Sequence, residues 1–125
     1  MKPSTIFLVA AICAIPPGPP AGAAVETVQG RLIDMACYRR NPKNDGEKHI
    51  DRPLDECATT CAKYGLPLAV LTANGRMYQV TGQMAASRNA KLLPHVLKDV
   101  IVTGNVTTDE EGALLIDATA IKPAK

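Results

Sequence analysis

The stretch VIVTGNVTTDEEGALLIDATAI (residues 100–121) decides the predicted fold. Apolar residues alternate with other residues in its first half and again in its second half, and a period of two is the pattern of a half-buried β-strand. Between the halves, TDEEG (108–112) has the composition of a turn. The residues in phase are Val100, Val102, Gly104 and Val106 in the first half and Leu114, Ile116, Ala118 and Ala120 in the second. The chain is therefore predicted to end in two consecutive strands.

The first predicted strand covers residues 25–37, VETVQGRLIDMAC, and ends at Cys37. It is rich in branched apolar residues, which favour strands. The alternation slips around Gly30, as it does at a β-bulge. A polar loop, residues 38–50, follows this strand.

A hairpin is predicted for residues 68–81, because Asn74-Gly75 suits a two-residue type I′ turn between two apolar strands. This turn would set the register of strands 68–73 and 76–81. The expected cross-strand pairs are Leu71 with Tyr78 and Ala69 with Val80.

Two helical segments complete the pattern. Residues 51–65, DRPLDECATTCAKYG, read as a short helix that Asp51 can cap and Gly65 can end. Cys57 and Cys61 are four positions apart and fall on one inward face of this helix. Residues 86–97 read as a shorter helical segment, broken near Pro94, that comes before the fourth strand.

The order of these elements predicts a mainly β fold, a small five-stranded Greek-key barrel like the oligonucleotide/oligosaccharide-binding (OB) fold. A short cysteine-bearing helix lies between strands 1 and 2. Over roughly residues 25–121 the pattern resembles that of small secreted bacterial OB-fold proteins, through its strand order, its bulged first strand and residues 100–121.

The N-terminus has the organisation of a signal peptide. Lys2 precedes an apolar run, residues 6–15, which is too short to span a bilayer, and small residues follow at 21–23. We expect residues 1–23 to be removed and residues 24–125 to form one periplasmic or secreted domain without a membrane span. Removing Lys2 leaves 13 basic residues against 12 acidic ones. This balance, with so few aromatic residues to stack on bases, argues against a nucleic-acid partner.

Export also decides how the cysteines are interpreted. Loss of Cys13 with the leader leaves Cys37, Cys57 and Cys61 in a compartment where disulfides persist. An odd number of cysteines there indicates a leftover thiol, an intermolecular bond or a metal site. A disulfide from Cys37 to Cys57 or Cys61 would fasten the helix to the barrel.

The alternative is a metal site made by Cys37, His49, Cys57 and Cys61. Two thiolates at positions i and i+4 of a helix can hold one ion, and a Cys₃His set suits Zn(II), while soft thiolates also suit Cu(I). The C-x₃-C spacing with a distant histidine is similar to that of periplasmic copper chaperones of cytochrome oxidase assembly. Those proteins have a thioredoxin fold, so the similarity concerns ligand spacing alone.

Five further residues are candidates for a supporting or ligating role. Asp34 is either a hydrogen-bond partner for His49 or an outward-facing strand residue. Met35, Met77 and Met84 are either sulfur ligands or core residues, and His95 is either a surface residue or a ligand.

The function classes follow from these alternatives. One is a non-enzymatic metal-binding protein for sequestration or delivery. The other is a non-enzymatic accessory module with a structural disulfide, which binds a small ligand or a periplasmic protein. Thiol-exchange catalysis is disfavoured, because the motif is not C-x-x-C after a strand.

Overall fold

The computed structural model describes residues 24–42 and 57–125 of the chain. The predicted signal peptide (1–23), the predicted helix cap Asp51 and the predicted ligand His49 lie outside these ranges. The elements are β1 (Ala24–Asp34), α1 (Met35–Arg40), α2 (Cys57–Lys63), β2 (Leu68–Leu71), β3 (Met77–Thr81), η1 (Gly82–Ala85), α3 (Ala86–Asn89), η2 (Leu93–His95), β4 (Asp99–Thr108) and β5 (Leu114–Pro123).

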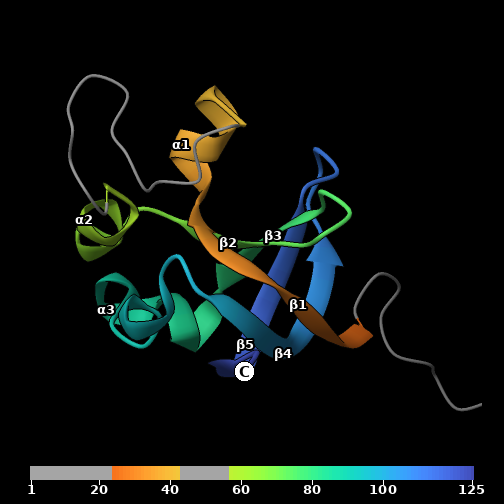
Figure 1. The fold of residues 1–125 in the computed structure, drawn as a ribbon. Helices are drawn as coiled ribbons and strands as arrows, with labels where there is room; N and C mark the ends of the chain where they lie inside the picture. The colour runs from red at the N-terminus through yellow and green to blue at the C-terminus, as the bar shows by residue number, and fades with distance from the viewer. Residues whose placement is uncertain (1–23, 43–56) are drawn as a thin grey trace, which may run out of the picture.

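The five strands close into a barrel in the order β1-β2-β3-β5-β4 (Figure 1). Every neighbouring pair is antiparallel except β3 and β5, which run parallel. The predicted mainly β, OB-like five-stranded barrel is therefore confirmed, with the cysteine-bearing helix between β1 and β2 and short helical turns before β4. The resemblance to secreted OB-fold proteins stays a prediction, because it concerns a family and not only a fold.

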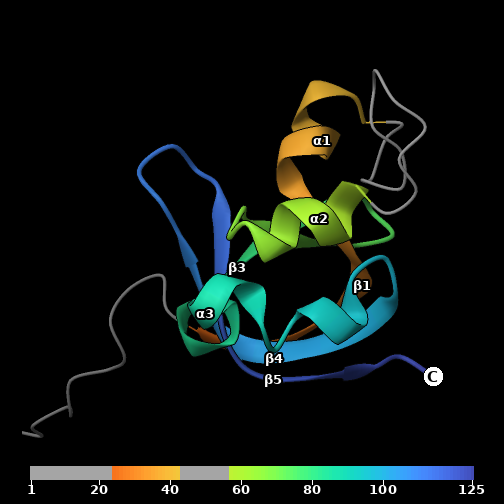
Figure 2. The same ribbon diagram turned by 90° about the vertical axis from the view of Figure 1, so that its left-hand side faces the viewer.

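The helices gather on one side of the barrel. In both Figure 1 and Figure 2, α2 lies between α1 and α3. In the described ranges, no helix combines the length and the apolar character that crossing a membrane requires.

The core fills the barrel and continues under α2. In β4, Val100, Val102, Gly104 and Val106 are all buried, as their alternation predicts. The largest fully buried side chains are Leu32, Ile33, Leu68, Leu92, Ile116, Val70, Val100, Val102 and Asp34. Asp34 is the one carboxylate in this set, and it belongs to the candidate site described below.

The predicted phase of the last strand holds only for its first half. Ile116 and Ala118 are buried, but Ala120 is exposed and Ile121 packs against the core instead. The register shifts between Thr103 and Gly104 of β4, so that one residue of β5 is left without a partner. This bulge reverses the alternation beyond Ala118.

The bulge predicted at Gly30 is wrong. The pairing of β1 with β4 continues through Gly30 without a shift, up to Arg31, where β1 begins to pair with β2. A Cβ atom at Gly30 would lie 2.7 Å from the carbonyl carbon of Leu71 in β2. Glycine is needed here because the two backbones approach closely.

The predicted hairpin exists, but its turn has three residues and its register differs by one. Leu71 pairs with Met77, Val70 with Tyr78 and Ala69 with Gln79. Only Gly75 has a positive φ, +84°, whereas a type I′ turn needs one at Asn74 as well. The amide of Thr72 donates to the carbonyl of Arg76, and this closes a three-residue loop. Such a loop ends in a left-handed residue, which Gly75 supplies.

Gly75→Val is expected to destabilise the protein by about 1 kcal/mol or more, because a β-branched residue resists a positive φ. Nothing lies within 4 Å of the added Cβ, so the cost is purely conformational. Gly75→Asn should retain most of the stability, since asparagine tolerates this region. Urea unfolding of both variants checks the turn, and equal stability of Gly75→Val and wild type would contradict it.

Candidate metal centre

Asp34 ends β1 and starts α1. Its carboxylate Oδ1 accepts hydrogen bonds from the backbone amides of Ala36 at 2.9 Å and Cys37 at 3.2 Å. An aspartate in this position satisfies amides that the first turn of a helix leaves free, so the chain turns into a helix here. The prediction that Cys37 ends a strand is therefore wrong, because Cys37 lies in the first turn of α1.

Packing fixes the orientation of α1. Met35 is buried with Ile33 and Ala69 in a second small core cluster, and Tyr38 and Met77 pack against it. Met84 packs against the main core. The three methionines considered as ligands therefore lie against apolar clusters, where a methionine serves as a space-filling residue.

α2 is held on the barrel by two alanines. Ala58 and Ala62 are fully buried in the main core. Cys57 precedes Ala58 and is buried, and Cys61 precedes Ala62 and is half-buried. Small side chains let the helix lie close to the strands, so the thiols are set close beneath α1. The predicted shared face of Cys57 and Cys61 is confirmed by their proximity.

The end of α2 is fixed from two directions. The amide of Leu66 donates to the carbonyl of Cys61 and the amide of Gly65 to that of Ala62, which is the Schellman arrangement, with Gly65 at φ +85°. The buried side chain of Asn89 donates to the carbonyls of Ala62 and Leu66 at 3.0 and 2.9 Å. These bonds anchor the turn that carries Cys61.

The three thiols meet between α1 and α2. The Sγ atom of Cys57 lies 4.0 Å from that of Cys37 and 3.8 Å from that of Cys61. All three cysteines are free, and a disulfide would need a separation of about 2.0 Å. Two sulfurs bound to one tetrahedral ion at about 2.3 Å lie about 3.8 Å apart. The two separations around Cys57 therefore fit thiolates that share one ion.

Asp34 belongs to the closest set of possible ligands. A carboxylate oxygen of Asp34 and the sulfurs of Cys37 and Cys57 all lie within 4.8 Å of one another, and Cys61 adjoins this set through Cys57 at 3.8 Å. Asp34 is only 1% exposed, which excludes the outward orientation considered for it. Its second oxygen, Oδ2, is buried and makes no hydrogen bond to any residue in the described part of the chain.

The surroundings of Cys37 and Cys61 favour the protonated forms of these two thiols. Burial raises the pKa of Cys37 from 9.0 to about 12, and the negative charge of Asp34 adds to the effect. Burial likewise raises the pKa of Cys61 to about 12, and the Asp34 carboxylate again contributes. Both thiols are therefore neutral at pH 7, and an ion that binds them as thiolates must displace their protons.

The reduced, metal-free protein is expected to lose stability as the pH rises from 9 towards 12. In that window the thiols of Cys37 and Cys61 are protonated in the folded state but ionise in the unfolded chain, whose pKa is near 9.0. The folded state then binds more protons, so the free energy of unfolding falls with pH and is unaffected below pH 9. Urea unfolding at pH 8 to 10.5 measures this. Cys61→Ser should show a shallower decline, and an identical decline would contradict the pKa shifts.

The other predicted residues lie elsewhere. His49 is outside the described residues. His95 lies in η2 and is not part of the group formed by Asp34, Cys37 and Cys57. The role of Asp34 as both cap and neighbour of the thiols was not predicted. The signal for it was an aspartate followed by a short helical stretch that ends in Arg39 and Arg40.

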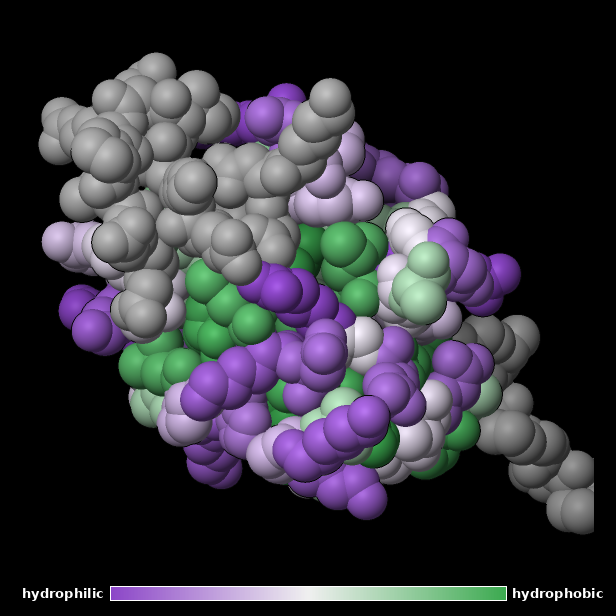
Figure 3. Space-filling view, viewed as in Figure 1, coloured by the Kyte–Doolittle hydropathy of each residue, from purple (hydrophilic) through white to green (hydrophobic). Residues whose placement is uncertain are grey.

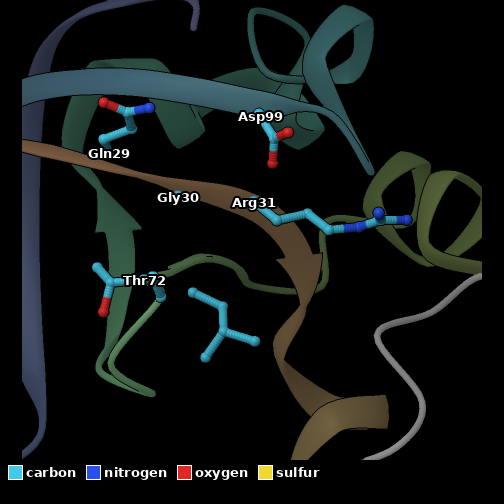
Figure 4. A pocket seen from close by; sticks show the side chains of 7 residues that line it. Gln29, Gly30, Arg31, Thr72 and Asp99 are labelled. Atoms are coloured by element: carbon cyan, nitrogen blue, oxygen red, sulfur yellow. The ribbon is translucent and has the colours of Figure 1, made fainter.

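A separate pocket of about 490 Å³ lies where β1 stops pairing with β4 and begins to pair with β2 (Figure 4). Its lining residues are Gln29, Gly30, Arg31, Leu71, Thr72, Ala73 and Asp99. The guanidinium of Arg31 points away from Gln29 and towards the helices, and the Asp99 carboxylate projects from β4 towards β1. The lining surface is mainly apolar, with the polar side chains of Gln29, Arg31, Thr72 and Asp99 around it, which suits a small molecule with both apolar and polar parts.

The surface around α2 is partly apolar. Figure 3 shows hydrophobic atoms gathered beside the grey segment, with hydrophilic surface around them. Tyr64 and Leu66, which follow α2, are two of the large hydrophobic side chains that are exposed among the described residues.

In comparisons with known proteins, no family model, no curated protein and no solved structure matches the chain.

Proposed function

We propose that this chain is an exported, non-enzymatic protein that binds a soft or borderline metal ion, Zn(II) or Cu(I), for sequestration or delivery. Cys37, Cys57 and Cys61 supply the thiolates. The sequence predicts His49 as a further ligand, and this residue lies outside the described part of the chain. The leader-like residues 1–23 support a location in the periplasm or outside the cell.

The observation that carries the proposal is the spacing of the sulfurs. Separations of 3.8 and 4.0 Å fit thiolates on one ion and are far from a disulfide. The elements that hold the sulfurs are packed independently of any ion: α2 through Ala58 and Ala62, and α1 through Met35. A site assembled by packing loses little conformational freedom when the ion arrives.

The test is a metal and thiol count on one sample. Protein purified from its exported form should carry bound metal by elemental analysis, and after metal removal it should show three reactive thiols in denaturant. Reduced protein titrated with Zn(II) or Cu(I) should bind one ion. Acid should release it, because the thiols regain their protons. One disulfide and one thiol, with no metal binding after reduction, would contradict the proposal.

That contrary result would favour the second candidate, a periplasmic accessory module with a Cys37 disulfide. The pocket at the junction of β1, β2 and β4 supports this candidate, since it offers a recess for a small ligand. A rise in melting temperature with a small ligand that Thr72→Leu abolishes would support it. The same rise in the variant would argue against this pocket.

A further inference from the structure

Asp34 has one oxygen engaged and the other without a partner. Two backbone amides, of Ala36 and Cys37, hold Oδ1 at 2.9 and 3.2 Å. Oδ2 is buried and makes no hydrogen bond within residues 24–42 and 57–125. Buried acceptors are nearly always paired, and one that is not requires an explanation such as an ion.

The cap geometry also explains why the Asp34 carboxylate is beside the sulfurs. Asp34 is the residue before α1, and Cys37 is the third residue of that helix, whose amide an N-cap side chain reaches. The capping bond therefore holds the carboxylate next to the residue that carries the Cys37 thiol. One oxygen of this carboxylate lies within 4.8 Å of the sulfurs of both Cys37 and Cys57. An aspartate three positions before a cysteine thus brings two possible metal ligands, a carboxylate oxygen and a thiol sulfur, close together.

The hydrogen bonds to Oδ1 fix the orientation of the Asp34 carboxylate. Carboxylates that bind an ion are themselves held by hydrogen bonds, which fix their orientation. Here Oδ1 is fixed by the backbone, so Oδ2 is directed without loss of side-chain freedom on binding. The cap leaves Oδ2 free to be a donor atom.

We propose that Oδ2 of Asp34 is the fourth ligand of the site, and that the site is therefore built for Zn(II) rather than Cu(I). This inference rests on the proposed metal-binding function. Zn(II) accepts thiolate and carboxylate together in a tetrahedral set, whereas Cu(I) is satisfied by soft sulfur ligands and gains little from a hard oxygen. A doubly charged ion also neutralises more of the charge on three thiolates and one carboxylate.

Asp34→Asn tests the fourth ligand with little disturbance of the fold. Asparagine caps a helix as well as aspartate does, so Oδ1 can keep its bonds to Ala36 and Cys37. The amide nitrogen that replaces Oδ2 cannot bind the ion. We expect the affinity for Zn(II) to fall more than about 100-fold, beyond the loss that outer partners of a ligand cause. The affinity for Cu(I) should change by less than about threefold, because its sulfur ligands remain.

Three controls separate this inference from the function on which it rests. Far-ultraviolet circular dichroism and melting of metal-free Asp34→Asn should match wild type. In the Co(II)-substituted variant the sulfur-to-metal charge-transfer band should persist while the visible bands change, because only an oxygen ligand is lost. His49→Ala should leave Zn(II) affinity almost unchanged.

The outcomes are distinct. If wild type binds neither ion, the proposed function fails. If Zn(II) binding is lost in Cys57→Ser but kept in Asp34→Asn, the function stands and Asp34 is not a ligand. A large loss of Zn(II) in His49→Ala alone would assign the fourth position to the histidine. A large loss of Cu(I) in Asp34→Asn would contradict the preference for zinc.

Discussion

Cys57→Ser is expected to remove tight metal binding, with a loss of roughly 70- to 900-fold in affinity. Structural zinc sites bind with about 10–16 kcal/mol shared among four ligands, so one thiolate contributes roughly 2.5–4 kcal/mol. Cys57 is the most buried of the three cysteines, and its sulfur lies between the other two, at 3.8 and 4.0 Å. A serine hydroxyl is not ionised at neutral pH and is a poor substitute for a thiolate.

The measurement is competition titration of reduced protein with a chromophoric chelator for Zn(II) and another for Cu(I). Thr60→Ser is a matched control, because it makes a similarly small change on the exposed side of the same helix. The double variant Cys57→Ser/Cys61→Ser should add little to the single loss, since both thiolates serve one ion. Wild-type affinity in Cys57→Ser would mean that the sulfurs do not form a metal site.

Gly30→Ala is expected to destabilise the protein by about 3 kcal/mol, at the upper end of the usual cost of overpacking. The added Cβ would lie 2.7 Å from the Leu71 carbonyl carbon and 2.9 Å from a methyl group of Val70. The methyl can rotate away, but the backbone of β2 cannot move without opening its pairing with β1. For a domain of this size the melting temperature should fall by more than about 10 °C.

Gly112→Ala provides the comparison. Gly112 has φ +85° with nothing within 4 Å of an added Cβ, so this change meets only conformational strain, about 1 kcal/mol. Thermal and urea unfolding of both variants measures the difference. If Gly30→Ala lowers the free energy of unfolding no more than Gly112→Ala does, the backbones of β1 and β2 do not approach closely at Gly30 and Leu71.

The sequence predicted those strands whose alternation alone determines their faces. Val100, Val102 and Val106 are buried as expected, because an uninterrupted strand must keep its period of two. The alternation of apolar residues does not indicate where a β-bulge adds a residue to a strand. The bulge opposite Thr103 and Gly104 reverses the later part of β5, and it depends on pairing between strands, which a single strand does not reveal.

The hairpin shows a second kind of limit. Asn74-Gly75 correctly located the turn, and Gly75 does have a positive φ. The same dipeptide also fits the three-residue loop found here, in which only the glycine is left-handed. The side-chain oxygen of Asn74 instead accepts from the backbone amide of Arg76 at 3.3 Å. One extra loop residue changes every pair in the hairpin, so the predicted register is off by one.

For the candidate site, the spacing of Cys57 and Cys61 was enough to place both thiols on one helix face. The meeting of α1 with α2 was not predictable in detail, because it depends on how Met35 and Ala58 pack into two separate clusters. The sequence did not predict the helix cap at Asp34, because the residues around it have a strand-like composition. The capping preference of aspartate overrides that composition and turns the chain into α1.

The closed order of the strands has a consequence for how this protein can associate with others. Each of the five strands is hydrogen-bonded to a neighbour on both sides. A sheet with an open edge can recruit an extended peptide or a second copy of itself by strand addition, which is also the first step of edge-to-edge aggregation. The barrel leaves only the outer parts of two long strands open on one side, because residues 24–30 of β1 and residues 118–123 of β5 pair with β4 alone. Strand addition is therefore restricted to those stretches. The proposed metal centre lies between α1 and α2, whose backbones are helical, so a partner that exchanged an ion there would have to recognise side chains.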